Sequence, residues 1–575
     1  MVFSRSLTNF VRNEVIPIVL SMQLLIGVLQ LLDILHPKYY PLIHGITMSS
    51  IFELEFSLKL PLEFLLFLWS AFMVNKTPWK VFLFPGSAIM LFPFLGLELS
   101  LVLATLLAVA VSLFYLKCYD GIFLWILFIL SVFEGFVLLH WIVFIPFDLA
   151  SPFLLLSEIE TGVFYVLGNY VPLLVLPMFF MWLLKPVILW GFENQEKPEF
   201  IIPKNDIKSF TWIILLFLLT FIGFLSVLYP YFSAVNPEGR QIGVDFSYYV
   251  RGIDIIQDDF SQAFTLSKGS RPIVYLVLIG FQRIFNLNAV NAVKLFPALL
   301  VPVLILSVAT LVLEISGNWK TALFAGFFTL CSYHVTSGMY AYFLSNMLGL
   351  SVLFFSLMFL IRALQRRSIS SLIIASLLGI LVLFIHPWTL VQYIVGIICT
   401  TFLLGYRVYI KREDPNDFYF IISYLGFLVF SELIKILIFQ GRSGISATYS
   451  TIQGIAHIPK FWYSSIFTFK ILYGGSMSIF LLFILVILGM LVIKTSPIVD
   501  SILLFFTFFT SLVFLVGNEV IKSRLMFNFP LGLYAAFGVV WLTERKSLSR
   551  IKPVIISFIL LTSLVYLFRT FANLI

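Results

Sequence analysis

The stretch Gln241–Pro272, QIGVDFSYYVRGIDIIQDDFSQAFTLSKGSRP, is a polar island in a chain that is otherwise mostly apolar. It places acidic and basic side chains beside aromatic ones, and it lies between two long apolar runs. Apolar runs of about 18 residues or more recur from one end of the chain to the other, and each can cross a bilayer as a helix. The pattern therefore predicts a polar loop that flanking membrane helices hold at the membrane surface.

The composition sets the fold class. The chain has 575 residues, of which 61% are hydrophobic and 11% are charged, whereas soluble domains carry about 25% charged residues. Strict alternation of apolar and polar residues is absent, which excludes a membrane β-barrel. The sequence predicts an all-α, polytopic helical membrane protein with about 17–18 transmembrane helices.

The expected spans fall into two groups. Six precede a polar segment rich in Pro and charge, and these are 14–36, 59–74, 81–94, 97–116, 121–146 and 163–190. Twelve follow it, and these are 209–233, 271–287, 290–313, 319–337, 341–363, 369–386, 388–406, 417–439, 474–493, 498–517, 525–543 and 552–573. We expect a six-span module over 1–192, a cytoplasmic linker over 193–208, and a second membrane domain over 209–575 with an external loop at 234–270.

The basic residues lie in short loops, so the net charge of +8 indicates positive-inside topology rather than nucleic-acid binding. This rule places the N-terminus in the cytoplasm of a multi-pass plasma-membrane protein. Counting forward from Lys208 and backward from the C-terminus gives results that differ by one crossing between 271 and 341. Either 271–287 is not a full span, or one of the segments in 290–337 re-enters the membrane.

The polar island contains a candidate catalytic base, Asp245, which follows Gly243-Val244 and precedes aromatic residues. A carboxylate beside aromatic rings is partly desolvated and suits proton abstraction from a hydroxyl group. Asp245 could instead be the N-cap of a helix that begins at Phe246. Asp258 and Asp259 are weak candidates for a divalent-cation site with Asp245, and the alternative for them is a solvated helix end.

Several polar residues lie at the expected outer ends of spans, where positive-inside bias does not account for them. Arg524 and Arg442 could bind a phosphate, because a guanidinium presents a planar fork that matches phosphate oxygens. His386 could donate to a phosphate or a sugar hydroxyl. The remaining candidates for substrate binding on this face are Tyr340, Asn346 and Arg271.

From Gly243 onward the chain resembles the GT-C superfamily of polytopic glycosyltransferases, especially the archaeal dolichyl-phosphate-mannose-type mannosyltransferase-like proteins. The resemblance covers roughly 205–575, whereas 1–192 resembles no family that we can name. It is carried by GVDF at 243–246, RPIVY at 271–275, AVKLFP at 292–297, SGMYAYFLSN at 337–346 and RLMFNFP at 524–530. Many members have an acidic pair where Asp245 is followed here by Phe246, and the Trp-Trp-Asp signature of oligosaccharyltransferases is absent.

The resemblance implies a membrane glycosyltransferase with a GT-C-like C-terminal part. Its sugar donor would be a polyprenyl phosphate sugar, and the reaction would take place on the extracytoplasmic face. Asp245 would be the catalytic base, and Arg524 would bind the phosphate. The expected partners are the lipid-linked donor, membrane lipid and partner subunits. No cofactor is firmly implied beyond a divalent cation.

Two other functions remain open. A transporter or flippase would use helices broken at prolines, together with the intramembrane residues Glu134, Glu432 and Lys435. A non-catalytic subunit of a larger complex would keep the same shell without activity.

Overall fold

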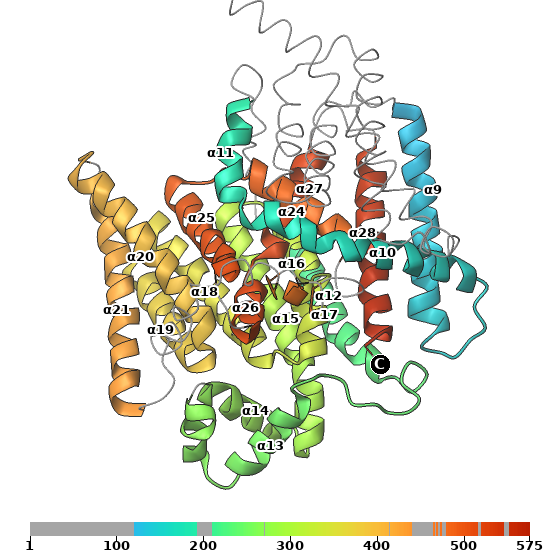
Figure 1. Cartoon of the computed structure of the whole chain (residues 1–575), viewed down its shortest axis with the longest axis horizontal. Helices are drawn as coiled ribbons and strands as arrows, with labels where there is room; N and C mark the ends of the chain where they lie inside the picture. The colour runs from blue at the N-terminus through green and yellow to red at the C-terminus, as the bar shows by residue number, and fades with distance from the viewer. Residues whose placement is uncertain are drawn as a thin grey trace, which may run out of the picture.

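The computed structural model describes residues 120–191, 210–269, 271–412, 414–439, 464–465, 467–469, 472–473, 479–515, 519–544 and 551–574. The expected spans between 14 and 116 and the linker 193–208 lie outside the described residues. Figure 1 shows the described elements as a bundle of helices.

Every regular element among the described residues is helical, which confirms the all-α class. The elements that precede the polar island are α9 (Asp120–Leu139), η4 (His140–Phe144), α10 (Leu154–Phe179), α11 (Met181–Gly191), α12 (Phe210–Leu228) and η5 (Tyr229–Tyr231). The island itself forms α13 (Phe246–Ile256), η6 (Phe260–Phe264) and η7 (Leu266–Gly269).

The elements that follow the island form the rest of the bundle. They are α14 (Pro272–Ile284), α15 (Ala289–Ser316), α16 (Trp319–Leu330), α17 (Tyr333–Ala341), α18 (Leu344–Arg366), α19 (Ile369–Ile385), α20 (Pro387–Tyr409), α21 (Asn416–Phe439), α24 (Phe480–Val492), α25 (Pro497–Ser511), η10 (Leu512–Leu515), α26 (Glu519–Phe527), α27 (Leu531–Thr543) and α28 (Lys552–Ala572).

Nine helical segments of the described chain are long and apolar enough to cross a membrane. They begin at Leu127, Phe210, Ala289, Leu344, Pro387, Asn416, Pro497, Ile521 and Lys552. Large apolar side chains such as Phe217, Phe402 and Leu437 are exposed on the outside of the bundle. An apolar exterior of this kind needs lipid around it. The protein is therefore a multi-pass membrane protein.

The segment expected as a span at 271–287 forms α14, which has only 13 residues. A helix of this length covers about 20 Å, well short of the roughly 30 Å hydrocarbon core of a bilayer. Helices α13 and α14 lie together at one end of the bundle, below the other helices in Figure 1. Neither α14 nor the 12-residue α16, which lies in the range of the second alternative, is long enough to be a full span.

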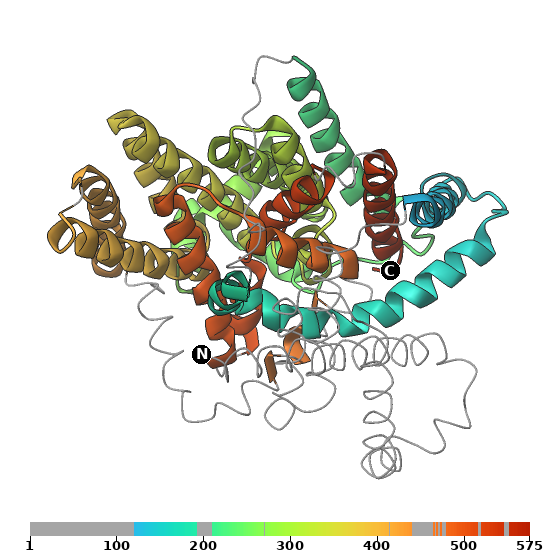
Figure 2. The same ribbon diagram turned by 90° about the horizontal axis from the view of Figure 1, so that it is seen from above.

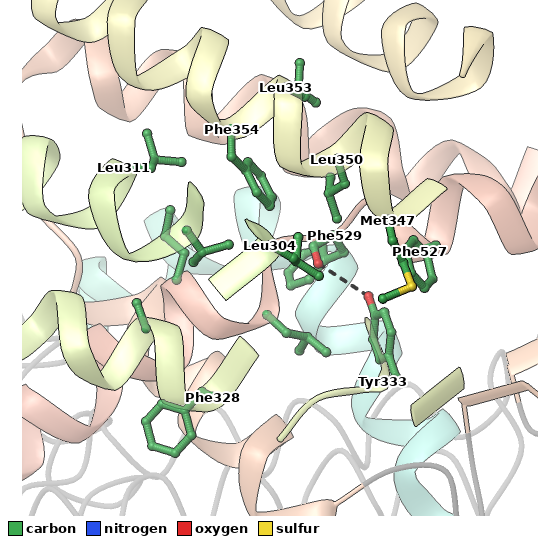
Figure 3. Packing of buried hydrophobic residues seen from close by; sticks show 14 of the residues in the cluster. Leu304, Leu311, Phe328, Tyr333, Met347, Leu350, Leu353, Phe354, Phe527 and Phe529 are labelled. Atoms are coloured by element: carbon green, nitrogen blue, oxygen red, sulfur yellow. Dashed lines mark hydrogen bonds between the residues drawn. The ribbon is translucent and has the colours of Figure 1, made fainter. Parts of the chain in front are cut away.

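Two further expected spans are interrupted. The segment 319–337 is divided into α16 and α17 by a turn at Cys331 and Ser332, and the Ser332 side chain caps α17. The segment 525–543 begins earlier, as α26, and a break at Asn528–Pro530 separates α26 from α27. Tyr333 connects the two breaks, because its hydroxyl donates to the carbonyl oxygens of Met526 and Phe529. Figure 3 shows the hydrogen bond to Phe529.

Glycines allow helices α24 and α27 to pack closely against each other in the core. A Cβ atom added at Gly489 would lie 1.7 Å from the carbonyl oxygen of Tyr534, and one added at Gly538 would lie 2.1 Å from that of Leu485. Backbone therefore contacts backbone across this interface. Small residues have this role in membrane proteins, where helix association depends on van der Waals packing.

Helix α18 shows that the bundle has two distinct ends. Near its C-terminus, Arg362 and Arg366 both pair with Glu314 at the end of α15, at 2.6 and 3.1 Å. The neighbouring Arg367 pairs with Asp414 and Asp417 beside α21. Asn346, at the N-terminal end of α18, is 16 residues before Arg362, a distance of about 24 Å along the helix axis. The basic loops therefore lie far from the residues that surround Asn346.

Figure 2 shows α10 as a long helix that runs across the molecule, from beside α9 toward α11. Helices α9 and α28 pack against each other on this side of the bundle, and α19, α20 and α21 pack together on the other. The expected span 163–190 is therefore replaced by α10 and α11, which meet at Phe180.

We predict that Gly489→Ala lowers the thermal unfolding temperature of the purified protein. The added methyl group collides with main chain that cannot move without separating α24 from α27, and overpacking of this kind costs about 1–3 kcal/mol. Gly426→Ala in α21 is the matched control, because no atom lies within 4 Å of its added Cβ. Equal unfolding temperatures for the two variants would contradict the close approach.

Candidate functional site

Main-chain hydrogen bonds fix the loop that carries Asp245. The Val244 N–H donates to the carbonyl oxygen of Tyr340 at 3.0 Å, and the Asp245 N–H donates to that of Ala341 at 3.4 Å. The start of the polar island is thereby attached to the end of α17. This attachment places Asp245 next to the residues that open α18.

Gly243 allows this attachment, because its φ angle is +102°. A Cβ atom at this position would lie 2.1 Å from the ring of Tyr342. Tyr342 also has a positive φ, +59°, and its hydroxyl donates to the carbonyl oxygen of Val293 at 2.7 Å. Its ring contacts those of Phe246 and Tyr249, so the aromatic residues of the island form the packed base of the loop.

Asp245 does occupy the N-cap position of α13, but its side chain makes no capping hydrogen bond. The carboxylate instead lies 3.5 Å from the Nη2 atom of Arg524, and 34% of the Asp245 side chain is exposed. The distance is long for an ion pair with good geometry. The carboxylate is therefore both beside a cation and accessible.

Arg524 is buried, with 9% of its side chain exposed. Its Nη1 atom donates to Oδ1 of Asn346 at 2.9 Å, and its guanidinium carbon lies 3.9 Å from the centre of the Phe343 ring. Stacking on an aromatic face and a hydrogen bond to an amide fix the plane of the guanidinium. The buried Nδ2 atom of Asn346 has no hydrogen-bond partner among the described residues.

Arg271 approaches from α14, where it is the N-cap residue. Its Nη1 atom donates to the hydroxyl of Tyr249 at 3.2 Å, and its guanidinium lies 5.8 Å from the ring centre of Tyr248. Ser345 N–H donates to the same Tyr249 hydroxyl at 3.3 Å, which ties Arg271 to the start of α18. Its Nε atom is buried without a hydrogen-bond partner in the described part of the chain.

His386 joins α19 to α20 and is fully buried. Its Nδ1 atom lies 2.9 Å from the hydroxyl oxygen of Thr389 and 3.3 Å from the Thr389 main-chain nitrogen. Burial, and then the positive charges of Arg524, Arg271 and Lys435, hold the pKa of His386 well below its usual range. The imidazole is therefore neutral at physiological pH and close to both arginines.

A hydrogen-bond chain connects His386 to the break between α26 and α27. The Thr389 hydroxyl donates to Oδ1 of Asn528 at 3.1 Å, and Nδ2 of Asn528 donates to Oε1 of Gln392 at 3.0 Å. Asn528 directly follows α26, the short helix that carries Arg524. The hydrogen-bond chain therefore fixes the position of His386 relative to Arg524. Asn528 has no charge to attract notice in the sequence, and only the helix break reveals its role.

Four other candidates take different places. Tyr340 contributes its carbonyl oxygen to the loop attachment, and its side chain is partly buried. Asp259 caps η6 by accepting from Ser261 N–H at 2.9 Å, and Asp258 is exposed beside it. In the described ranges, no three His, Cys, Asp or Glu residues come together as metal ligands. Arg442 lies outside the described residues.

The charges at this site do not balance among the described residues. Arg524 and Arg271 lie close enough to influence each other, and Asp245 is the carboxylate that contacts one of them. Two guanidinium groups and one partly exposed carboxylate leave one positive charge in a largely buried place. An uncompensated buried charge costs several kcal/mol, so the arrangement favours the binding of an anion.

The sequence identified the charged residues of this site but not those that orient them. Phe343 lies beneath Arg524, Tyr249 beside Arg271 and Thr389 beside His386. A spacing pattern does not distinguish such aromatic and hydroxyl residues from ordinary membrane-helix residues. No protein-family model and no curated protein matches this chain.

We predict that Gly243→Ala destabilises the protein by more than Gly239→Ala. Both glycines have positive φ, so both substitutions add backbone strain of order 1 kcal/mol. Only at Gly243 does the new methyl group also collide with a ring, that of Tyr342. Chemical or thermal unfolding of the two variants tests this, and equal losses would show that the contact with Tyr342 does not hold the loop.

Proposed function

We propose that this protein is a membrane glycosyltransferase that transfers a sugar from a polyprenyl-phosphate donor to a hydroxyl group on the extracytoplasmic face. Asp245 is the catalytic base, and Arg524 and Arg271 bind the phosphate of the donor. The unbalanced pair of guanidinium groups beside an accessible carboxylate is the observation that carries this proposal.

The chemistry of the pair suits a phosphate ester of a lipid. Arginine forms bidentate hydrogen bonds with phosphate oxygens and remains charged at any relevant pH. Arg524 belongs to the segment Ile521–Thr543, which is apolar enough to cross the membrane. A ligand that reaches Arg524 must be compatible with the hydrocarbon of the membrane, and a polyprenyl chain meets this condition. A phosphodiester carries one negative charge and neutralises the excess at the site.

The proposed reaction is a single displacement. The hydroxyl proton of the acceptor passes to a carboxylate oxygen of Asp245 as the acceptor oxygen attacks the anomeric carbon. The bond between that carbon and the phosphate oxygen breaks, and its electron pair leaves with the polyprenyl phosphate. Arg524 and Arg271 stabilise the negative charge that develops on the leaving group, and the neutral imidazole of His386 forms a hydrogen bond with a sugar hydroxyl.

We infer the orientation from the charges at the two ends of the bundle. The basic residues Arg362, Arg366 and Arg367 lie at the end of α18 remote from Asn346. Positive-inside bias assigns the basic end to the cytoplasm. The site is then on the outer face of the plasma membrane, where lipid-linked sugars are used without nucleotide donors.

We predict that Asp245→Asn lowers sugar transfer by about 10²–10⁴-fold while binding of the lipid phosphate persists. Transfer is measured in proteoliposomes as release of dolichyl phosphate from dolichyl-phosphate mannose, with membrane extract as the source of acceptor. Binding is measured as the rise in unfolding temperature that dolichyl phosphate produces. Arg524→Lys and Arg271→Gln should weaken both, because the phosphate loses its planar donors.

Asp254→Asn is the matched control, since Asp254 is an exposed acid on the same helix, α13. It should change neither transfer nor binding. If Asp245→Asn transfers sugar as well as Asp254→Asn does, Asp245 is not the base. If Arg524→Lys binds dolichyl phosphate as the unchanged protein does, the arginine pair is not the phosphate site.

The assigned orientation makes a separate prediction about two exposed positions. In a cysteine-free background, Gly239→Cys lies at the end of the bundle near Asp245, and Ser370→Cys lies at the basic end. A membrane-impermeant maleimide added to intact cells should label position 239, and position 370 should react only after the membrane is opened. The reverse pattern would place the site in the cytoplasm.

A further inference from the structure

A second buried group of ionisable residues lies away from the proposed transferase site, where α9 and α10 meet α28. In Figure 1, α9 and α28 run side by side. Arg569 of α28 pairs with Glu160 of α10 at 2.5 Å, and both side chains are 1% exposed or less. Glu134 of α9 is also buried, and it is close enough to interact electrostatically with both.

The other polar groups that the structure places around these residues are mostly neutral hydroxyls. Arg569 lies 6.0 Å from the ring centre of Tyr566, whose hydroxyl shares a hydrogen bond with Thr336. Thr562 and Thr161 offer neutral hydroxyls near Glu134 and Glu160. Two further titratable groups lie nearby in the described part of the chain: Cys331, which is buried near Tyr566, and His140, which bonds to Ser151.

Two carboxyl groups therefore share one arginine in an apolar environment. If both were ionised, one negative charge would have no partner among the described residues, at a cost of several kcal/mol. The second oxygen of each carboxyl group, Oε2, is buried without a hydrogen-bond partner in the described ranges. A carboxyl group that binds a proton removes this charge.

We propose that Glu134, Glu160 and Arg569 form a proton-binding site in which Glu134 holds the proton and Glu160 remains ionised as the partner of Arg569. The assignment to Glu134 follows from the contacts, because Glu160 makes the short ion pair with Arg569. Glu134 reaches the pair from a different helix. With Glu134 protonated, the three side chains together carry no net charge.

A cavity adjoins α10 next to this site. It has a volume of about 620 Å³, and Thr161, Ser157, Glu158 and His140 are among the residues that line it. Thr161 follows Glu160 directly, and Ser157 lies one helical turn before it on the same side of α10.

The site should make stability depend on pH in a defined direction. The folded protein holds a proton on Glu134 that the unfolded chain releases at neutral pH. Stability therefore falls as pH rises, because folded protein binds more protons than unfolded protein there. Loss of the proton leaves a second buried negative charge between α9 and α10.

Infrared difference spectroscopy of the purified protein tests this site, because a protonated carboxyl group has a carbonyl stretching band that a carboxylate lacks. At neutral pH the unchanged protein should show one such band that disappears when the pH is raised. Glu134→Gln should lack the band and should lose the decline of unfolding temperature with pH. Glu158→Gln, an exposed acid on α10, should keep both.

Two further variants test how many carboxyl groups of the site are protonated. In Glu160→Gln, Glu134 becomes the partner of Arg569 and ionises, so the band should be lost. In Arg569→Met, both carboxyl groups lack a cation, so the band should double. A band that survives Glu134→Gln, or the lack of any such band in the unchanged protein, would overturn the proposal. The measurement uses no sugar donor, so its outcome is independent of the proposed transfer reaction.

Discussion

The guanidinium of Arg524 is the constraint on which the described site depends. It is buried in an apolar helix bundle, where a positive charge is stable only beside negative charge and hydrogen-bond acceptors. The protein supplies an aromatic face from Phe343, one amide oxygen from Asn346 and a partly exposed carboxylate from Asp245 at 3.5 Å. These partners orient the guanidinium of Arg524. The single carboxylate does not neutralise the combined positive charge of Arg524 and Arg271. The site therefore has an excess positive charge, which a bound anion would neutralise.

The fold brings this site together by breaking helices. The break at Asn528 turns a span into α26 and α27, the turn at Ser332 separates α16 from α17, and His386 separates α19 from α20. Each break leaves main-chain and side-chain polar groups at one end of the bundle, where continuous helices would offer only apolar surface. The island then folds over this end as α13 and α14. The second ionisable cluster, which includes Arg569, connects a different set of helices, α9, α10 and α28.

Hydropathy was sufficient to predict the all-α membrane fold and most spans after residue 209, because a 20-residue apolar run has few alternatives in a bilayer. It misassigned 271–287, because apolar content alone does not distinguish the short, packed helix α14 from a span. Charge bias predicted that Asp245, Asn346, Arg271 and Arg524 share one end of the bundle, and they do. The N-cap alternative for Asp245 was correct for its backbone but not for its side chain. The sequence could not reveal the partners Phe343, Tyr249 and Asn528, since their roles depend on contacts between distant segments.

A cryo-electron microscopy map of the protein with a short-chain polyprenyl phosphate tests the central claim most directly. The account predicts phosphate density within hydrogen-bonding distance of both Arg524 and Arg271, with the carboxylate of Asp245 facing the open side of that density. The prenyl chain should extend from it toward the lipid-exposed surface. Phosphate density elsewhere, or a closed pair of Arg524 and Asp245 in the presence of saturating lipid, would contradict it.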